Sequence, residues 1–121
     1  MYIKSVRWID KEAKEAEVVI SDNNYELLCF SHPFTKNVGE KLEEPISCLN
    51  VEDVFKAFKE EVYVVKYENY FSYSIRGLLY NKKDKIVLVG DIKLSLEDEY
   101  IPNDLREGEY IEFKVSRLDL Y

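Results

Sequence analysis

The chain has 121 residues, with 24 Asp and Glu against 17 Lys and Arg, and a net charge of −7 at pH 7. This length suffices for one domain that buries roughly two-thirds of its unfolded surface, whereas the excess of acids disfavours binding to nucleic acid phosphates or an anionic membrane. No segment is apolar over the roughly 18 residues of a membrane span and the start lacks a signal-peptide core, so we expect one cytoplasmic domain over residues 1–121.

The N-terminal quarter of the chain is expected to form three strands. Residues 2–9 and 17–21 are rich in apolar side chains, and residues 25–30 follow the turn sequence Asp22-Asn23-Asn24. Asn tolerates the positive φ of a tight turn better than other non-glycine residues. The sequence therefore predicts a β-hairpin formed by residues 17–21 and 25–30.

The middle of the chain is less regular. Two prolines and a glycine interrupt residues 32–49, which predicts a long connection with one short strand at 46–49. The segment that follows has four apolar residues at i, i+3, i+4 and i+7, namely Val51, Val54, Phe55 and Phe58. Because Asn50 is also a good N-cap, the sequence predicts a short α-helix near residues 51–60.

Four further strands are expected in the C-terminal half, at residues 62–67, 71–80, 86–96 and 110–117. The second and third alternate apolar and polar side chains and are joined by a polar loop, which predicts a hairpin. Gly77 and Gly90 fall on the apolar side of these strands, where a missing side chain marks a bulge, a bend or the close approach of another backbone. Both glycines therefore indicate a curled sheet.

Together these elements predict a mainly β protein, a small antiparallel β-barrel with one short α-helix near residues 51–60. The ten tyrosines agree with this, because Tyr favours half-buried positions on a pleated sheet. The strand succession resembles an OB-type or related small barrel, in which closure also removes exposed edges. A resemblance at the level of architecture carries no function with it.

The segment CFSHPF contains the single histidine and one of the two cysteines. Cys29, His32 and Cys48 are residue types that bind zinc, so a metal- or thiol-dependent enzyme is one interpretation. In a regular strand, however, Cys29 and His32 point to opposite faces, and structural zinc sites use two close pairs of ligands. The sequence favours two reduced thiols, no metal and no cofactor, with His32 at a strand end before Pro33.

Aromatic residues concentrate in the segment from residue 63 to residue 80, and rings on one face of a barrel can stack on bases, sugars or a protein. With the nearby cations they predict a binding surface formed by Tyr63, Tyr67, Tyr73, Arg76, Lys82 and Lys83. The same segment also contains Tyr70 and Tyr80. Only two or three of its tyrosines are expected to be exposed. Six acids within residues 97–109 form a second feature, a solvated rim that would steer a basic partner.

The function that the sequence favours is a non-catalytic module that recognises a protein partner through exposed tyrosines and the acidic rim. A single-stranded nucleic acid binder of OB type is the first alternative, in which the same tyrosines and the lysines of the 81–85 loop would act against an unfavourable net charge. The enzyme built on Cys29, His32 and Cys48 is the second. The sequence leaves the oligomeric state open.

Overall fold

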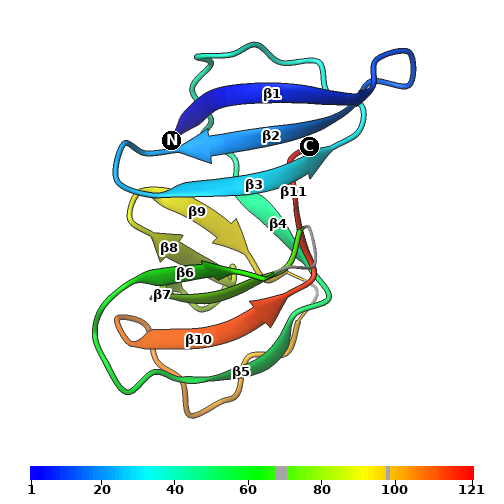
Figure 1. Cartoon of the computed structure of the whole chain (residues 1–121). Coiled ribbons are helices and arrows are strands. Elements are labelled where there is room, and N and C mark those ends of the chain that lie inside the picture. The colour runs from blue at the N-terminus through cyan, green and yellow to red at the C-terminus, as the bar shows by residue number, and fades with distance from the viewer. Residues whose placement is uncertain (68–70, 98) are drawn as a thin grey trace.

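The computed structural model describes residues 1–67, 71–97 and 99–121, and in these residues it contains strands but no helix (Figure 1). Eleven strands form one sheet in the order β1-β2-β3-β11-β4-β9-β8-β7-β10-β5, and β6 pairs with β7 beside this path. The mainly β fold is therefore confirmed. A search of the described residues finds no helix of the length and apolarity that a membrane crossing requires.

The first three strands form an antiparallel meander in the upper part of Figure 1, made of β1 (Tyr2–Asp10), β2 (Glu15–Ser21) and β3 (Glu26–Ser31). The predicted hairpin is confirmed. In its turn, Asn23 has a φ of 79°, and the Asp22 carboxylate accepts hydrogen bonds from the backbone N–H groups of Asn24 at 2.9 Å and Tyr25 at 2.7 Å.

The remaining strands are arranged around β7 (Tyr73–Asn81). One edge of β7 pairs with β10 and the other pairs first with β6 and then with β8. The outer strands continue this pattern, because β5 pairs with β10 and β9 with β8. The bounds of these strands are β5 (Glu52–Lys56), β6 (Tyr63–Lys66), β8 (Ile86–Val89), β9 (Ile92–Ser95) and β10 (Tyr110–Val115).

Two short strands join the meander to the rest of the sheet. The predicted strand at 46–49 is confirmed as β4 (Ile46–Leu49), and the chain ends in β11 (Arg117–Asp119). β11 lies between β3 and β4, and β4 pairs in parallel with β9. One hydrophobic core runs through both parts, with Ile20 and Leu27 from the meander and Phe113 and Ile75 from the other strands all fully or almost fully buried.

The sheet is not closed, so the predicted barrel is wrong. Its two ends, β1 and β5, do not pair with each other in the described residues. The beginning of the outer edge of β1 is instead covered by the long connection, where the Ile3 N–H donates to the Glu40 carbonyl at 3.0 Å and the Gly39 N–H to the Ile3 carbonyl at 2.7 Å. These bonds occupy the backbone groups of Ile3 that a closing strand would need at this end of β1.

The helix predicted near residues 51–60 is also wrong, because residues 52–56 form β5. Asn50 and Asp53 have φ values of 53° and 55°, which a right-handed helix does not allow. The four apolar residues do not share a buried face either, since Val51 is buried and Phe58 is 99% exposed. Pairing with β10 satisfies the backbone of this segment, and tertiary contact thereby overrides a short helical pattern.

The strand predicted at 86–96 is divided into β8 and β9 by a turn at Gly90, which has a φ of 59°. The turn changes which side chains face the core. Val87 and Val89 are fully buried before the turn, and Ile92 and Leu94 after it. One continuous strand would instead bury Ile86 and Leu88 on the same face as Ile92 and Leu94, but Ile86 and Leu88 are only half-buried. The last predicted strand, 110–117, likewise ends at Val115 as β10 before β11 begins.

Tyr73 ties the two parts of the sheet together, and replacing it by phenylalanine is expected to lower the free energy of unfolding by about 1–2 kcal/mol. Its hydroxyl accepts the Leu28 N–H of β3 at 2.9 Å, and its side chain is only 5% exposed. Burial also raises the pKa of this phenol. Urea denaturation monitored by circular dichroism measures the loss. Tyr80→Phe, at a residue 58% exposed, is the control and is expected to change little; equal losses in both variants would contradict the role given to Tyr73.

Candidate functional site

A row of four side chains crosses the outer face of β5, β10, β7 and β6. Phe55 is opposite Glu112, Glu112 is opposite Arg76, and Arg76 is opposite Tyr63. Side chains that are directly opposite on adjacent strands lie on the same face of a sheet and contact each other. The pairing register therefore brings one residue from each of the four strands into a single surface.

Arg76 is the centre of this row. Its guanidinium donates to Glu112 through Nε at 2.7 Å, with the second nitrogen Nη2 at 2.6 Å from the same carboxylate oxygen, and Nη1 lies 3.5 Å from Glu61. The Arg76 and Glu112 side chains are only 13% and 15% exposed. The carbon of the guanidinium also lies 4.4 Å from the centre of the Tyr63 ring, a cation–π contact. These contacts fix the geometry of the face.

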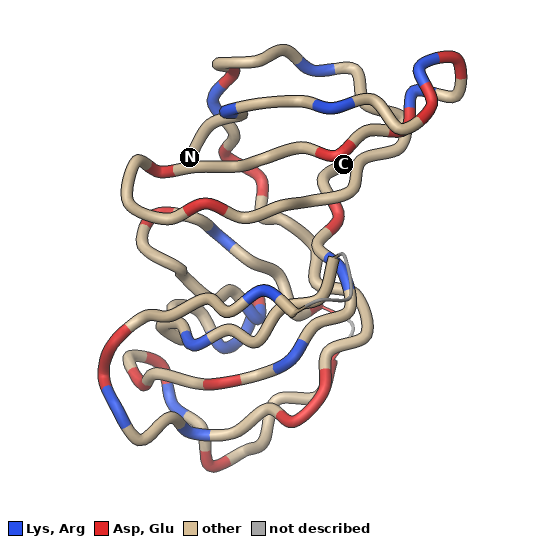
Figure 2. The backbone as a smooth tube through the Cα atoms, in the orientation of Figure 1, with Lys and Arg blue, Asp and Glu red and all other residues tan. Residues whose placement is uncertain are grey.

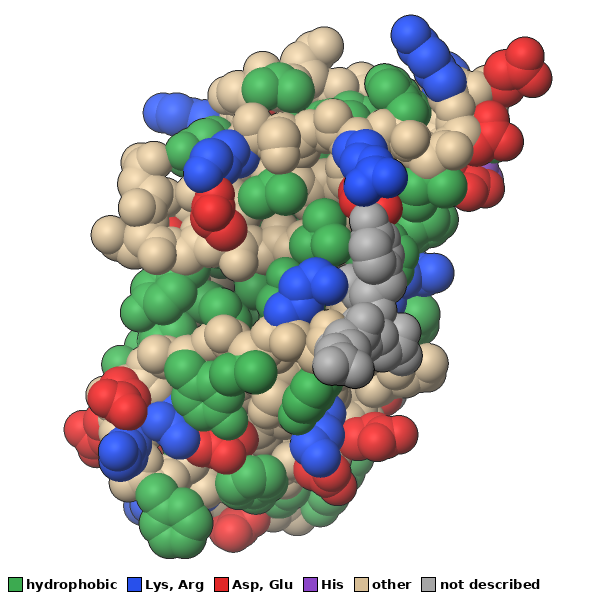
Figure 3. All heavy atoms as spheres, viewed as in Figure 1, with side chains coloured by type: hydrophobic (Ala, Val, Ile, Leu, Met, Phe, Trp, Pro, Cys, Tyr) green, Lys and Arg blue, Asp and Glu red, His purple; other side chains and the backbone are tan. Residues whose placement is uncertain are grey.

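Apolar side chains remain exposed around this centre. Phe55 is 45% exposed, Val65 48% and Tyr67 41%, and Phe58 in the loop between β5 and β6 is 99% exposed. With Tyr63 they form what we call the aromatic face, defined as Phe55, Phe58, Tyr63, Val65 and Tyr67. In Figure 3, hydrophobic side chains lie among charged ones over the lower part of the visible surface, where Figure 1 places β6, β10 and β5.

A hollow of about 440 Å³ opens beside the row, lined by Asp53, Val54, Phe55, Ser74, Glu112, Phe113 and Lys114. It lies where β5 has one more residue than β10 between two paired positions, a β-bulge at which Asp53 has a φ of 55°. Lys114 and Asp53 form an exposed ion pair at its margin, 3.8 Å apart. The hollow therefore combines apolar walls with a polar rim.

The tyrosines predicted to bind a ligand are separated by the fold. Tyr63 and Tyr67 are part of the aromatic face, whereas the ring of Tyr73 points to the opposite side of the sheet and belongs to the core. Tyr80 is exposed at the far end of β7. Tyr70 lies outside the described residues. Arg76 does lie beside Tyr63, as the predicted surface requires, although its charge is already paired.

The lysines of the 81–85 loop lie apart from the aromatic face. The Tyr67 N–H donates to the carbonyl of Ser72, the residue before β7 begins. The 81–85 loop begins at the other end of this nine-residue strand, so it lies roughly 30 Å from Tyr67 along the extended strand. Lys82 donates its ammonium to the Asn103 carbonyl at 3.0 Å. Lys83 is exposed and lines a different hollow. The fold therefore does not join the predicted tyrosines and lysines into one surface.

The acids of the 97–109 segment are partly used within the chain. Glu107 accepts the backbone N–H of Lys82 at 3.0 Å. The hydrogen bond from Lys56 lowers the pKa of Glu109, which also accepts the Arg106 N–H. Asp98, the second of the six acids, lies outside the described residues. Figure 2 shows acidic and basic residues interspersed along the whole chain rather than segregated.

The three candidate metal ligands do not form a site. Cys29 is fully buried in β3, and burial raises the pKa of its thiol as it does that of Cys48. Both cysteines are free, because β11 lies between the strands that carry them. His32 is exposed after the end of β3. In the described part of the chain, no three or more His, Cys, Asp or Glu side chains are arranged to hold a metal ion.

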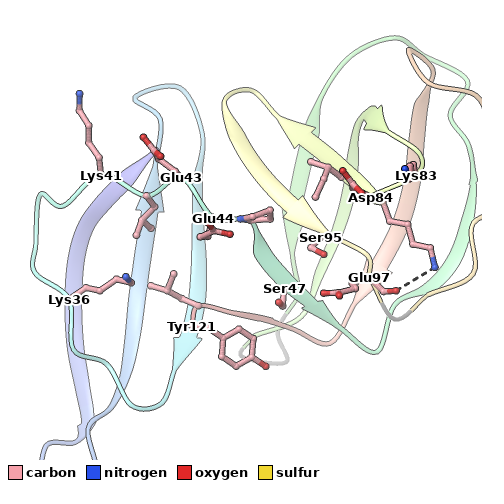
Figure 4. Close-up of a pocket in the computed structure, with 15 residues that line it drawn as sticks. Lys36, Lys41, Glu43, Glu44, Ser47, Lys83, Asp84, Ser95, Glu97 and Tyr121 are labelled. Atoms are coloured by element: carbon pink, nitrogen blue, oxygen red, sulfur yellow. Dashed lines mark hydrogen bonds between the residues drawn. The ribbon is translucent and has the colours of Figure 1, made fainter.

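A wider hollow of about 620 Å³ lies between the long connection, the loop that joins β7 to β8, and the end of β9 (Figure 4). Four lysines and four acids line it, so it has no net charge; they are Lys36, Lys41, Lys83, Lys85, Glu43, Glu44, Asp84 and Glu97. The Lys85 ammonium is held by the carbonyls of Glu97 at 3.4 Å and Glu99 at 2.7 Å. Such balanced, solvated charges select no particular class of ligand.

Sequence reasoning missed Phe55, Phe58 and Val65 as surface residues. The sequence predicts the first two within an α-helix near residues 51–60 and Val65 within a strand at 62–67, without indicating that these side chains are exposed on one surface. One signal was available: residues 52–56 follow Asn50, which tolerates a positive φ as readily as it caps a helix. The register that places Phe55 across from Glu112 depends on residues about 57 positions apart and has no local signal.

Comparison with known proteins gives one match. The model of the family described as uncharacterised conserved protein UCP019853 matches residues 1–121. No curated protein and no solved structure matches the chain.

Proposed function

The chain belongs to this family of uncharacterised conserved proteins, and we propose that it is a non-catalytic module that binds a protein partner through the aromatic face. The observation that carries the proposal is the exposure of Phe55, which lines a preformed hollow, and of Val65, which is opposite Ser74 in the lining of the same hollow. Clustered exposed apolar side chains mark interaction sites on soluble proteins. Aromatic residues are also enriched where interfaces gain most of their binding energy.

The geometry of the face supports a protein rather than a nucleic acid as the partner. The central cation, Arg76, is held by Glu112 and Glu61 and is largely buried. Lys114 is paired with Asp53 at the rim. Single-stranded nucleic acid binding needs unpaired cations along the phosphates beside the stacking rings. A protein partner needs only an apolar anchor for the hollow and polar groups for its rim.

The partner is expected to insert one apolar side chain into the hollow beside Phe55. Phe55 provides an apolar wall, and the Asp53 and Lys114 pair can bond to backbone groups of the partner. The Arg76 ion pair keeps the strands in register beneath the site, so little order has to be gained on binding. The acidic segment 97–109 would raise the association rate of a basic partner and lose this effect at high salt.

The double variant Phe55→Ser/Phe58→Ser is expected to weaken partner binding at least about tenfold, because two exposed rings leave the interface. The measurement is affinity capture from a nuclease-treated lysate of the natural host, followed by titration of the captured protein against purified variants. Both side chains are exposed, so the variant should fold like the wild type, which circular dichroism checks.

A matched control removes two other exposed apolar side chains that lie in the meander and its connection, Ile9→Ser/Val38→Ser. These residues are 49% and 62% exposed, and this variant should keep the wild-type affinity. Equal affinity of both double variants would refute the role of the aromatic face. A parallel capture from untreated lysate that recovers nucleic acid, lost on nuclease treatment and at high salt, with no protein retained after nuclease, would refute the proposed class of partner.

A further inference from the structure

A second row of side chains crosses the outer face of the sheet, next to the row of Arg76. Lys114 of β10 is opposite Glu52 of β5 and, on its other side, opposite Ser74 of β7. Ser74 is in turn opposite Val65 of β6. Side chains directly opposite one another lie on the same face of a sheet. Ser74 has the smallest side chain of this row and lines the hollow beside Phe55, so a larger residue at this position would fill it.

The charge around this hollow is negative. Asp53 and Glu112 line it with one base, Lys114. Arg76 binds Glu112 through Nε and Nη2, but both contact the same oxygen, Oε1, and no hydrogen bond from a described residue reaches Oε2. Glu52 is exposed and forms no ion pair with the described part of the chain. Three acids therefore stand against two bases, and none of the three is fully enclosed.

Resting on the proposed function, we infer that the partner binds here through an extended basic segment. One apolar side chain of this segment fills the hollow over Ser74, and a Lys or Arg two residues away binds Glu52 and Asp53. Ser74 and Glu52 are on β7 and β5, two strands apart, which is about 10 Å across a sheet. Side chains at i and i+2 of an extended chain lie on one face about 7 Å apart, and a long basic side chain spans the remainder.

Each part of this segment matches a feature of the site. The apolar side chain removes the exposed surfaces of Phe55 and Val65 from water, which favours association. The cation is attracted by the two acids at the rim, and the net charge of −7 attracts the same class of partner from a distance. Lys and Arg also have apolar stems that can pack beside Phe55 while the charge stays in water. An acidic segment would instead be repelled.

Filling the hollow tests whether it holds the apolar side chain. Ser74→Leu places a larger side chain at a half-buried position of the outer face and leaves Phe55 and Phe58 unchanged. This variant is expected to bind the captured partner at least about tenfold more weakly, because its own leucine occupies the space. Ser5→Leu adds the same side chain at an exposed position of β1 and should keep the wild-type affinity. Circular dichroism checks that both variants fold.

The chemistry of the segment is tested with the wild-type protein and a library of short random peptides displayed on phage. We expect enrichment of peptides that have an aromatic or aliphatic residue two positions from a Lys or Arg. These peptides should lose their binding to Ser74→Leu. Enrichment of acidic or uncharged peptides, or no enrichment at all, would overturn the inference.

Neutral variants of the rim test the role of charge. Glu52→Gln/Asp53→Asn is expected to weaken binding of a selected basic peptide about tenfold at low salt, and less at high salt, as measured by fluorescence polarisation. Asp53 has a φ of 55°, which asparagine also tolerates, so the bulge is kept. Lys114→Gln removes the base from the same rim and should tighten binding of the peptide about threefold. Weaker binding in both variants would contradict selection for a basic segment.

The partner experiment separates this inference from the proposed function. Loss of capture in Phe55→Ser/Phe58→Ser with normal capture in Ser74→Leu would keep the aromatic face as a binding surface and overturn the hollow as the anchor site. Normal capture in both variants would refute the proposed function as well. A second copy of this chain is the competing occupant of the hollow. A dimer in sedimentation velocity that is lost in Ser74→Leu would replace the basic partner by self-association.

Discussion

Replacing Gly77 by alanine is expected to lower the free energy of unfolding by about 3 kcal/mol or more, through overpacking against backbone. A Cβ atom at this position would lie 2.7 Å from the Leu88 carbonyl oxygen and 2.6 Å from a methyl group of Val87. Both residues belong to β8, which takes over the edge of β7 beyond β6. The strands would have to separate, with loss of ladder bonds, because a carbonyl oxygen cannot move as a flexible side chain does.

The measurement is chemical denaturation of the variant beside Gly39→Ala. Nothing lies within 4 Å of a Cβ at Gly39, but its φ of 88° is unfavourable for alanine. The control should therefore lose only about 1 kcal/mol, from backbone conformation without crowding. A Gly77→Ala variant no less stable than this control would show that β7 and β8 can adjust, and would remove the explanation given for the glycine.

Replacing Asp22 by alanine is expected to lower the free energy of unfolding by about 2–3 kcal/mol, because three backbone N–H groups lose their acceptor. Two of them, on Asn24 and Tyr25, belong to the β2–β3 turn. The third is the N–H of Asp91, bonded at 2.8 Å in the turn between β8 and β9. The carboxylate therefore joins the meander to the other part of the sheet.

Asp22→Asn separates the two roles. The side-chain oxygen of asparagine can still accept from the β2–β3 turn, but its amide N–H₂ cannot accept from Asp91. We expect a loss of about 1 kcal/mol, less than for alanine. Equal losses in both variants would mean that the hairpin turn contributes nothing. Urea denaturation of both variants and the wild type at one pH provides the comparison.

The same group predicts a pH dependence. Burial raises the pKa of Asp22, but the backbone N–H groups of Asp91, Tyr25 and Asn24 outweigh it and the pKa is lowered overall. A carboxyl whose pKa is lower in the folded state stabilises the fold fully above its unfolded pKa and loses this effect as the pH falls further. The difference in stability between the wild type and Asp22→Ala should thus shrink below about pH 4. A constant difference down to acid unfolding would contradict this.

Local patterns determined most of the strands. The alternation of residues 71–80 correctly identified the face of β7 that is buried, with Ile75 and Leu79 fully enclosed. The asparagines after Asp22 correctly marked the first hairpin. For Gly77 the sequence allowed a bulge, a bend or the close approach of another backbone, and the structure shows the backbone of Leu88 close to it. These features depend on residues within a few positions of one another, so they can be read without a partner strand.

Pairing between strands that are distant in the sequence explains where the local sequence patterns gave wrong predictions. Residues 51–60 have a helical spacing, but Glu52, Phe55 and Lys56 pair with β10, and an isolated helix of about ten residues is too short to compete. The tyrosines of residues 63–80 illustrate the same limit for the site. Tyr63 is on the outer face and Tyr73 in the core because Tyr63 pairs with Arg76, a register set from the other strand.

The sequence by itself determined the mainly β class, the first hairpin turn and the buried side of β7. These follow from side-chain alternation and turn chemistry, which act over a few residues. Only the tertiary structure decided that the sheet stays open among the described residues, that Phe55, Glu112, Arg76 and Tyr63 form one row across four strands, and that Tyr73 lies in the core. Each of these depends on which strands are neighbours, and that choice is made by the burial of one core shared by the whole chain.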